Sequence, residues 1–95
     1  MRFAFVYHGG SVPEESRQEN DQAWGKWIAT LHEQAGVRVG KARTISNGAV
    51  TDYKGDISGI SFIEANSLAD ALALAQRCPG LPYGGSVDVF EEYQD

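Results

Sequence analysis

His8 is the best candidate for a catalytic residue in this sequence. It follows the apolar segment Met1–Tyr7 and precedes Gly9 and Gly10. Glycines let the backbone approach a ligand closely, and an imidazole with a pKa near ~6.5 exchanges protons near neutral pH. We therefore expect His8 to act as a catalytic base, the alternative being an exposed or turn-capping histidine.

A carboxylate beside His8 would orient the imidazole and raise its basicity. Two aspartates, Asp52 and Asp56, flank a turn-rich connector in the middle of the chain. We expect Asp52 to be the catalytic partner of His8. The alternative is that both aspartates only stabilise turns, as this residue type often does.

Three aromatic residues, Tyr7, Trp24 and Tyr83, are candidates for binding a ligand near His8. Small-molecule pockets commonly have aromatic walls with a few polar groups. A phenol hydroxyl can also orient a carbonyl or hydroxyl group of a ligand. The alternative for each of them is a structural role in the core.

The sequence contains no convincing metal site or activated thiol. His8 and His32 are far apart in sequence, and neither has a second ligand at the helical spacing that metal motifs use. We therefore expect no metal or cofactor, and haem or metal binding is the weakest hypothesis. Cys78 precedes Pro79 at a predicted helix end, where the helix dipole opposes thiolate formation. A buried structural cysteine is expected there.

Hydrophobic periodicity predicts the element order β-α-β-β-α-β. The expected strands are Met1–Tyr7, Val37–Ile45, Ile57–Ala65 and Ser86–Tyr93. The expected helices run from about Val12 or Pro13 to Ala35, and from Ser67 to just before Pro79. Asn47-Gly48 predicts a small extra hairpin with a type I′ turn.

Three short signals mark the helix ends. Ser11-Val12-Pro13-Glu14 and Ser67-Leu68-Ala69-Asp70 both match the capping box. Gly36 is expected to form the C-cap of the first helix.

This order is that of a ferredoxin-like βαββαβ fold of the α+β class, with a four-stranded antiparallel sheet in a single domain spanning residues 1–95. Two helices can cover only one face of such a sheet. The first and third strands are nevertheless apolar on both faces. Because large exposed apolar patches usually mark interfaces, we expect a homodimer that packs sheet against sheet.

Composition narrows the classes of partner. The 95 residues carry a net charge of −5, from 8 basic and 13 acidic residues. Nucleic acid is therefore not expected as the main partner, because phosphate binding needs clustered Lys and Arg. No apolar run approaches the ~18–20 residues of a membrane span, and we find no signal peptide. With one cysteine, the expectation is a soluble cytoplasmic protein.

Several segments together resemble the YCII-related, DGPF-domain family of the dimeric α+β barrel superfamily. The matching segments are Phe3–Gly9, Ser58–Ala65, Ser67–Ala75, Cys78-Pro79 and Gly84–Val89. The resemblance implies a ferredoxin-like protomer that dimerises face to face. The family's Asp-Gly-Pro-Phe signature falls near Val50-Thr51-Asp52, where only the aspartate is present. A histidine found early in the first helix of some relatives is absent from Asn20–Trp24.

We therefore expect a small dimeric protein with a ligand cleft between its helix layer and its sheet. Cofactor-free acid–base catalysis on a small carbonyl or lactone-like compound is the first functional hypothesis. The alternative is a non-catalytic small-molecule-binding or regulatory interaction module. Activity or binding that titrates near neutral pH would favour the first.

Overall fold

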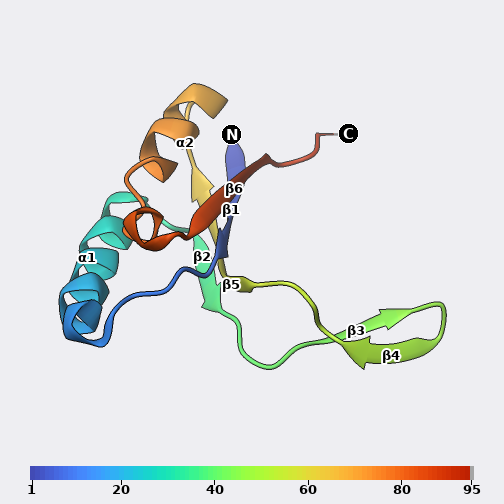
Figure 1. The fold of residues 1–95 in the computed structure, drawn as a ribbon. Coiled ribbons are helices and arrows are strands. Elements are labelled where there is room, and N and C mark those ends of the chain that lie inside the picture. The colour runs from blue at the N-terminus through green and yellow to red at the C-terminus, as the bar shows by residue number, and fades with distance from the viewer. Residues whose placement is uncertain (95) are drawn as a thin grey trace.

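Four antiparallel strands form the main sheet of the protein, which a computed structural model describes over residues 1–94 (Figure 1). In spatial order they are β2 (Ala35–Arg38), β5 (Ile57–Glu64), β1 (Arg2–His8) and β6 (Ser86–Glu91). Strand β1 is central and pairs with both β5 and β6. The predicted ferredoxin-like βαββαβ arrangement is therefore confirmed.

Both helices lie on one side of this sheet (Figure 1). They are α1 (Arg17–Thr30) and α2 (Leu68–Ala75), and two 3₁₀ turns, η1 (Glu14–Ser16) and η2 (Leu81–Tyr83), accompany them. No helix within residues 1–94 is both long enough and apolar enough to cross a membrane.

Alternate residues of β1 form the centre of the core. Phe3, Phe5 and Tyr7 are 0%, 0% and 6% exposed and face the helices. The ring of Phe5 stacks on that of Trp27 in α1, with their centroids 6.3 Å apart. The Trp27 indole N–H also donates a hydrogen bond to the Leu74 carbonyl in α2, at 3.0 Å. Trp27 thus joins both helices to the sheet.

The first helix is shorter than predicted at both ends. It begins at Arg17, after the turn η1, and Ser11 does not cap it. The Ser11 amide instead donates to the Tyr83 carbonyl. The strongly polar start of this segment offers few apolar side chains to bury, so a longer helix would gain little from packing.

The C-terminal end of α1 also differs from the prediction. The helix ends at Thr30 with Leu31 as its C-cap, so the prediction that Gly36 caps it is wrong, and His32 takes a left-handed conformation with φ of 51°. Gly36 lies in β2, where an added Cβ would collide with the Glu33 carboxylate. A side chain at position 36 would therefore displace the Glu33 carboxylate, and Gly36 does not terminate the helix.

The predicted second strand is two strands, which separate around Gly40. The first part is β2, and the second is β3 (Arg43–Ser46), which pairs with β4 (Ala49–Asp52) in a separate hairpin. The predicted turn is confirmed, because Asn47 and Gly48 both have positive φ. The predicted cap of α2 is confirmed too, since the Asp70 amide donates to Ser67 Oγ at 3.1 Å.

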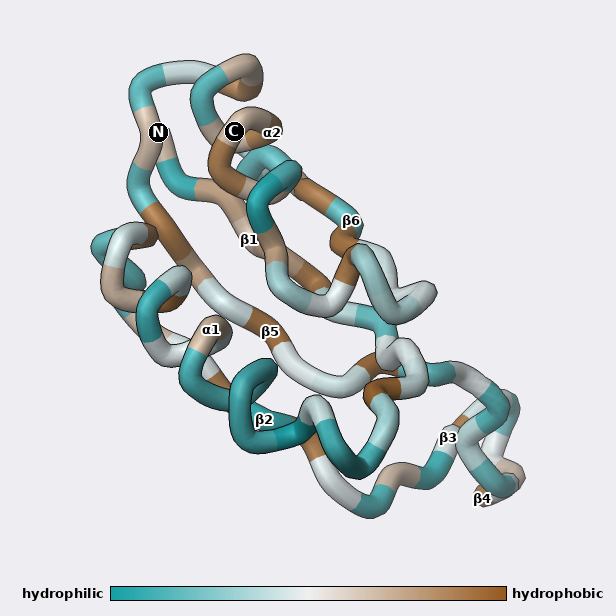
Figure 2. Tube along the Cα trace, turned by 60° about the vertical axis from the view of Figure 1, so that its left-hand side comes forward, coloured by the Kyte–Doolittle hydropathy of each residue, from teal (hydrophilic) through white to brown (hydrophobic). Residues whose placement is uncertain are grey.

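The face of the sheet opposite the helices is uncovered, and we call it the open face. Its residues alternate along each strand with those that face the helices. Three of its large apolar side chains, Val37, Phe62 and Phe90, are 57%, 38% and 56% exposed. Hydrophobic segments run along the sheet strands in Figure 2. The chain thus leaves on its surface the apolar face that the sequence pattern predicted.

The core role of Phe5 can be tested by truncation. Replacing Phe5 with Ala should lower the free energy of unfolding by about 3–5 kcal/mol, because it leaves a cavity between sheet and helices. Chemical denaturation would measure the loss. Tyr93→Ala is the control, since Tyr93 is 84% exposed and exposed substitutions change stability by about 0.5 kcal/mol or less. Equal losses in both variants would contradict the assignment.

Candidate functional site

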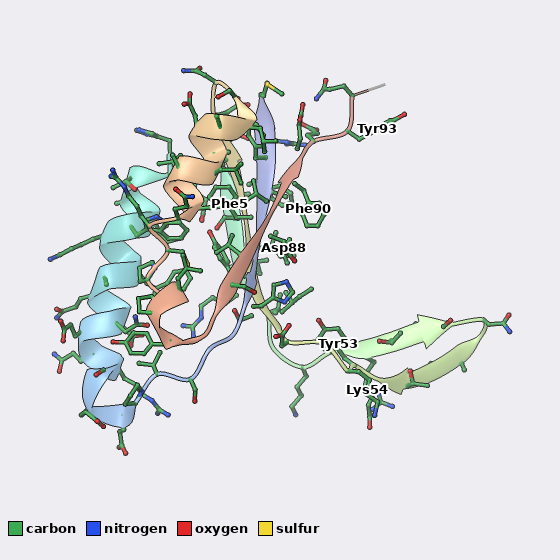
Figure 3. All side chains as sticks on the ribbon, turned by 45° about the horizontal axis from the view of Figure 1, so that its top comes forward. Phe5, Tyr53, Lys54, Asp88, Phe90 and Tyr93 are labelled. Atoms are coloured by element: carbon green, nitrogen blue, oxygen red, sulfur yellow. The ribbon has the colours of Figure 1, made fainter. Side chains whose placement is uncertain are left out.

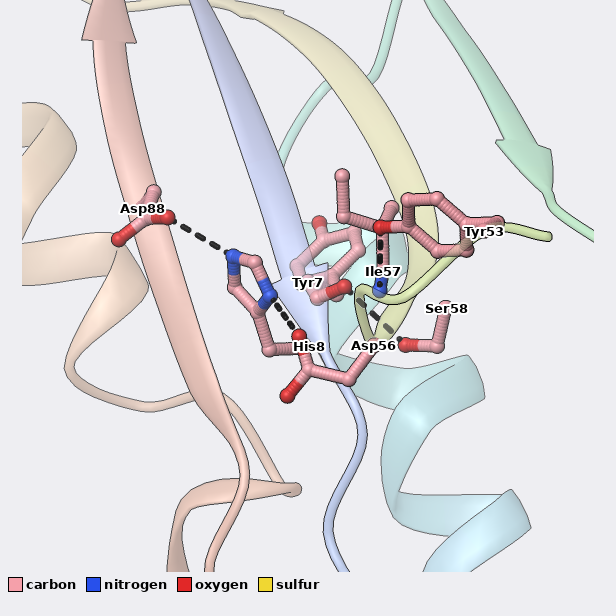
Figure 4. Close-up of polar contacts among 7 residues, drawn as sticks. All are labelled: Tyr7, His8, Tyr53, Asp56, Ile57, Ser58 and Asp88. Carbon is pink, nitrogen blue, oxygen red and sulfur yellow. Dashed lines mark hydrogen bonds and ion pairs between the residues drawn. The ribbon is translucent and has the colours of Figure 1, made fainter. Parts of the chain in front are cut away.

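The imidazole of His8 lies between two carboxylates on the open face (Figure 4). Its Nδ1 is 2.5 Å from Asp56 Oδ1, and its Nε2 is 2.8 Å from Asp88 Oδ2. The His8 side chain is 22% exposed, whereas those of Asp56 and Asp88 are 68% and 58% exposed. The cluster is therefore accessible from solvent in the single chain.

Three separate segments bring these side chains together. His8 ends β1 and pairs with Ser86 of β6, so Asp88, two residues further along, lies on the same face. Asp56 precedes β5, and its carbonyl accepts a hydrogen bond from the Gly9 amide at 3.1 Å. A register shift between Tyr7 and His8 occurs at the same place. The sheet register and one backbone bond thus fix the site.

This geometry favours the protonated imidazole. A neutral imidazole has one N–H, but two carboxylates can both be satisfied only by the two N–H groups of an imidazolium. The hydrogen bond to Asp56 and then that to Asp88 raise the pKa of His8 above its usual 6.5, although desolvation opposes them. The protonated ring of His8 can therefore donate to both carboxylates at once.

The carboxylates that contact His8 are Asp56 and Asp88 rather than Asp52. Asp52 ends β4, where its carboxylate lies 3.6 Å from Arg43 Nη1 across the hairpin. The hairpin β3–β4, which ends at Asp52, projects away from β1 (Figure 1), whereas the Asp56 carbonyl accepts the Gly9 amide at the end of β1. A signal for Asp88 was present in the sequence. The alternation of Asp88 with Val87 and Val89 places it on the face opposite those valines.

Tyr7 and His8 point to opposite faces of the sheet, because neighbouring strand residues alternate. Tyr7 packs on the helix side, where its ring meets that of Trp24 edge-on with centroids 5.2 Å apart. Tyr83 lies in η2 and accepts the Ser11 amide through its carbonyl. The structure therefore brings Tyr7 and Trp24 together, but it does not gather them with His8 in one cleft between helices and sheet.

The hydroxyl of Tyr7 belongs to a polar network within the core. It donates to Ser61 Oγ at 2.8 Å, and Ser61 Oγ donates to Glu33 Oε2 at 2.5 Å. Burial raises the pKa of Tyr7 to about 12. Because Ser61 is 2% exposed, this network satisfies buried polar atoms and joins β1 and β5 to the segment after α1.

Other candidate groups lie away from His8. His32 is exposed after α1, and Cys78 is buried, with burial raising the pKa of its thiol. Residues 1–94 contain no group of three or more His, Cys, Asp and Glu side chains arranged to hold a metal ion. A surface depression of about 490 Å³ lies beside Met1, Glu64 and Arg77, remote from the His8 cluster.

The raised pKa of His8 predicts a pH-dependent contribution to stability. The folded state holds the second imidazole proton of His8 more tightly than the unfolded state does. The stabilisation is therefore complete at pH values below ~6.5, the pKa of an unperturbed histidine. It is lost as the pH rises through the folded-state pKa. The loss of unfolding free energy in His8→Asn should therefore be largest at mildly acidic pH and should shrink with increasing pH.

Denaturation of both proteins across this pH range would measure the effect. His32→Asn is a matched control, because asparagine tolerates the positive φ of that position. NMR titration of the imidazole protons would give the pKa of His8 directly, and Asp88→Asn should move it toward 6.5. A His8 that titrates at or below 6.5 in the unaltered protein would contradict the bridged geometry.

Comparison with known proteins now adds to this geometry. The family model for the YCII-related domain matches residues 1–94. No protein of curated function matches the sequence. Among solved structures, the chain is similar to 5-chloro-2-hydroxyhydroquinone dehydrochlorinase (TftG) from Burkholderia phenoliruptrix AC1100, in complex with 2,5-dihydroxybenzoquinone. The TM-score is 0.60 at 21% identity, covering 99% of this chain and 94% of that one, which establishes a shared fold.

Proposed function

This chain belongs to the YCII-related domain family, and we propose that it is a homodimeric enzyme that moves protons on a small oxygenated compound without a cofactor. The observation that carries the proposal is the position of His8 between Asp56 and Asp88. A paired acid and base, held close together and accessible, is the minimum needed for proton transfer catalysis.

The proposed reaction is the tautomerisation of a carbonyl or lactone-like compound. Asp88 takes a proton from the carbon next to the carbonyl, while the His8 imidazolium gives its proton to the carbonyl oxygen. Transfer of the proton from Asp88 to His8 Nε2, across the 2.8 Å contact, then restores both groups. The net change moves one proton from carbon to oxygen, with no electrons exchanged. Asp56 holds His8 Nδ1 throughout and acts as a positioning residue.

The substrate class has support from the structural neighbour. That dehydrochlorinase is in complex with a dihydroxybenzoquinone, a small ring bearing carbonyl and hydroxyl oxygens. A compound of this class would offer His8 an oxygen that accepts a proton. We propose small cyclic ketones, quinone-like rings and lactones as the compounds to test.

A second copy of the chain is proposed to cover the open face. Val37, Phe62 and Phe90 leave an apolar surface that a sheet-to-sheet contact would bury. Covering this face would exclude water from the side of His8 that now faces solvent, which strengthens the electrostatic interactions there. A cytoplasmic location remains a prediction from sequence.

The alternative function is a non-catalytic binding or regulatory module. The exposure of Asp56 and Asp88, at 68% and 58%, favours it, because catalytic carboxylates usually lie in more enclosed sites. A module of this kind would bind a compound at His8 without turning it over.

Solvent-deuterium exchange tests the enzyme proposal. Small cyclic ketones, hydroxyquinones and lactones would be incubated with the protein in deuterated buffer, and NMR would follow exchange next to the carbonyl. His8→Asn should slow exchange by about 10²–10⁴-fold, the usual contribution of a general acid or base. Because the acid form of His8 is required, the rate should fall as the pH rises through its raised pKa.

Asp70→Asn is the control, since it removes one exposed carboxylate from α2, beside the depression at Met1 and Glu64 rather than beside His8. It should leave the exchange rate unchanged. Exchange that persists at the original rate in His8→Asn would rule out the proposed role of His8. Binding of a test compound with no exchange would favour the alternative module.

A further inference from the structure

The hairpin β3–β4 projects from the sheet on the side opposite the helices (Figures 1 and 3). We call residues 40–55, which contain it, the arm. Its presence explains the extended shape, since the radius of gyration is 14.7 Å where about 12.4 Å is typical of a compact chain of this length. An isolated two-stranded hairpin is marginally stable in water. The arm therefore lacks, within its own chain, the packing that would normally hold it.

One side of the arm is apolar at its outer end. Ile45 and Val50 are directly paired across the hairpin, and they are 74% and 58% exposed. Arg43 and Asp52 lie two residues away on the same side. The other side carries Thr44 and Thr51, with Ser46 and Ala49. The arm therefore has one side that exposes large apolar side chains, as interfaces do, and one side with small, mostly polar residues that suit solvent.

The charge of the arm is opposite to that of the rest of the chain. Its charged residues are Lys41, Arg43, Asp52 and Lys54. Three basic residues against one acidic residue give the arm a net charge of +2. Because the whole chain carries −5, the remaining residues carry −7. A positive arm that extends away from its own negative body is complementary to the body of a second copy.

The excess negative charge of the open face lies at the His8 cluster. Glu64 is paired with the N-terminal amine and Glu92 with Arg2. Asp56 and Asp88, in contrast, share the single positive charge of His8, which leaves one negative charge uncompensated. The cations of a partner's arm are therefore attracted to the end of the sheet where His8 lies.

The area of the open face leads to the same conclusion. Four strands at ~4.8 Å spacing and about 20 Å long make a flat area of about 400 Å². Stable dimers bury about 800 Å² on each partner. Even with the extra accessible area of its side chains, the sheet face is a small interface, and the arm supplies further surface on the same side of the molecule.

From these observations we propose that the arm of each chain docks on the open face of a second copy and covers the partner's His8 cluster. This inference rests on the dimer in the proposed function and extends it, because each site is then completed by residues of two chains. Ile45 and Val50 pack on apolar residues of the partner's open face. Lys41, Arg43 and Lys54 bring positive charge to the partner's Asp56 and Asp88.

Analytical ultracentrifugation tests whether the arm holds the dimer. The double variant Ile45→Asp with Val50→Asp places two charges on the interface side of the arm. The matched control, Thr44→Asp with Thr51→Asp, places two charges on the other side of the same hairpin. The first variant should weaken dimerisation by about 100-fold or more, since two apolar side chains no longer bury their surface. Both variants lower the net charge of the arm from +2 to 0, so the difference between them isolates the apolar contact, and the control should dimerise at least ten-fold more tightly than the first variant.

Paramagnetic NMR tests where the arm lies. A spin label on Thr44→Cys reports from the arm without altering Ile45, and Cys78 is only 4% exposed and can be retained. Labelled chains are mixed with ¹⁵N-enriched chains that carry no label. The label should broaden the amide signals of Gly9 and Asp88 in the ¹⁵N-enriched chains. A label on Asp21→Cys in α1 should not broaden them.

Two results overturn the proposal for the arm while leaving the dimer intact: a dimer that is equally stable in the double variant and in its matched control, or absence of this broadening. A chain that is monomeric at every concentration overturns it together with the dimer. Neither measurement depends on proton transfer. The role of His8 is tested separately by deuterium exchange, so a failure of the arm and a failure of the chemistry are distinguishable.

Discussion

The alternation of side chains along β1 is the constraint on which this structure depends. Phe3, Phe5 and Tyr7 point to the helices and form the core, so Val6 and His8 must point the other way. Because β1 is the central strand, its register with β5 and β6 sets which residues surround His8. A shift of one residue in any of these pairings would exchange core and surface along the whole strand.

The same constraint explains why a carboxylate pair can meet one imidazole at a sheet end. Asp88 lies on the face of His8 because it is two residues from Ser86, the partner of His8. Asp56 reaches the other ring nitrogen only because the chain re-enters the sheet there and bonds to Gly9. One contact therefore comes from regular pairing and the other from an irregular connection. The imidazolium joins them, so its protonation state influences the ends of three strands.

The fold was predictable from sequence to the extent that local patterns determine it. The Asn47-Gly48 turn and the Ser67 cap follow from short-range rules, and the order of the elements along the chain follows from hydrophobic periodicity. The site was predictable only in part. His8 is identifiable because its residue type is distinctive, whereas the choice between Asp52 and Asp56 depends on where a loop returns to the sheet, which sequence does not say. The alternation rule itself excludes Tyr7 from a site with His8, because adjacent strand residues point to opposite faces.

The two faces of the sheet thus perform different tasks. The helix side is complete within one chain, since Tyr7, Ser61 and Glu33 satisfy one another there. On the open side, the apolar residues have no packing partner within residues 1–94, and the acidic cluster at His8 faces solvent. An interface that supplied both apolar surface and positive charge would bury these apolar residues and neutralise the acidic cluster. The arm carries that combination, and for this reason the chemistry of His8 and the assembly of the protein are best understood as one problem.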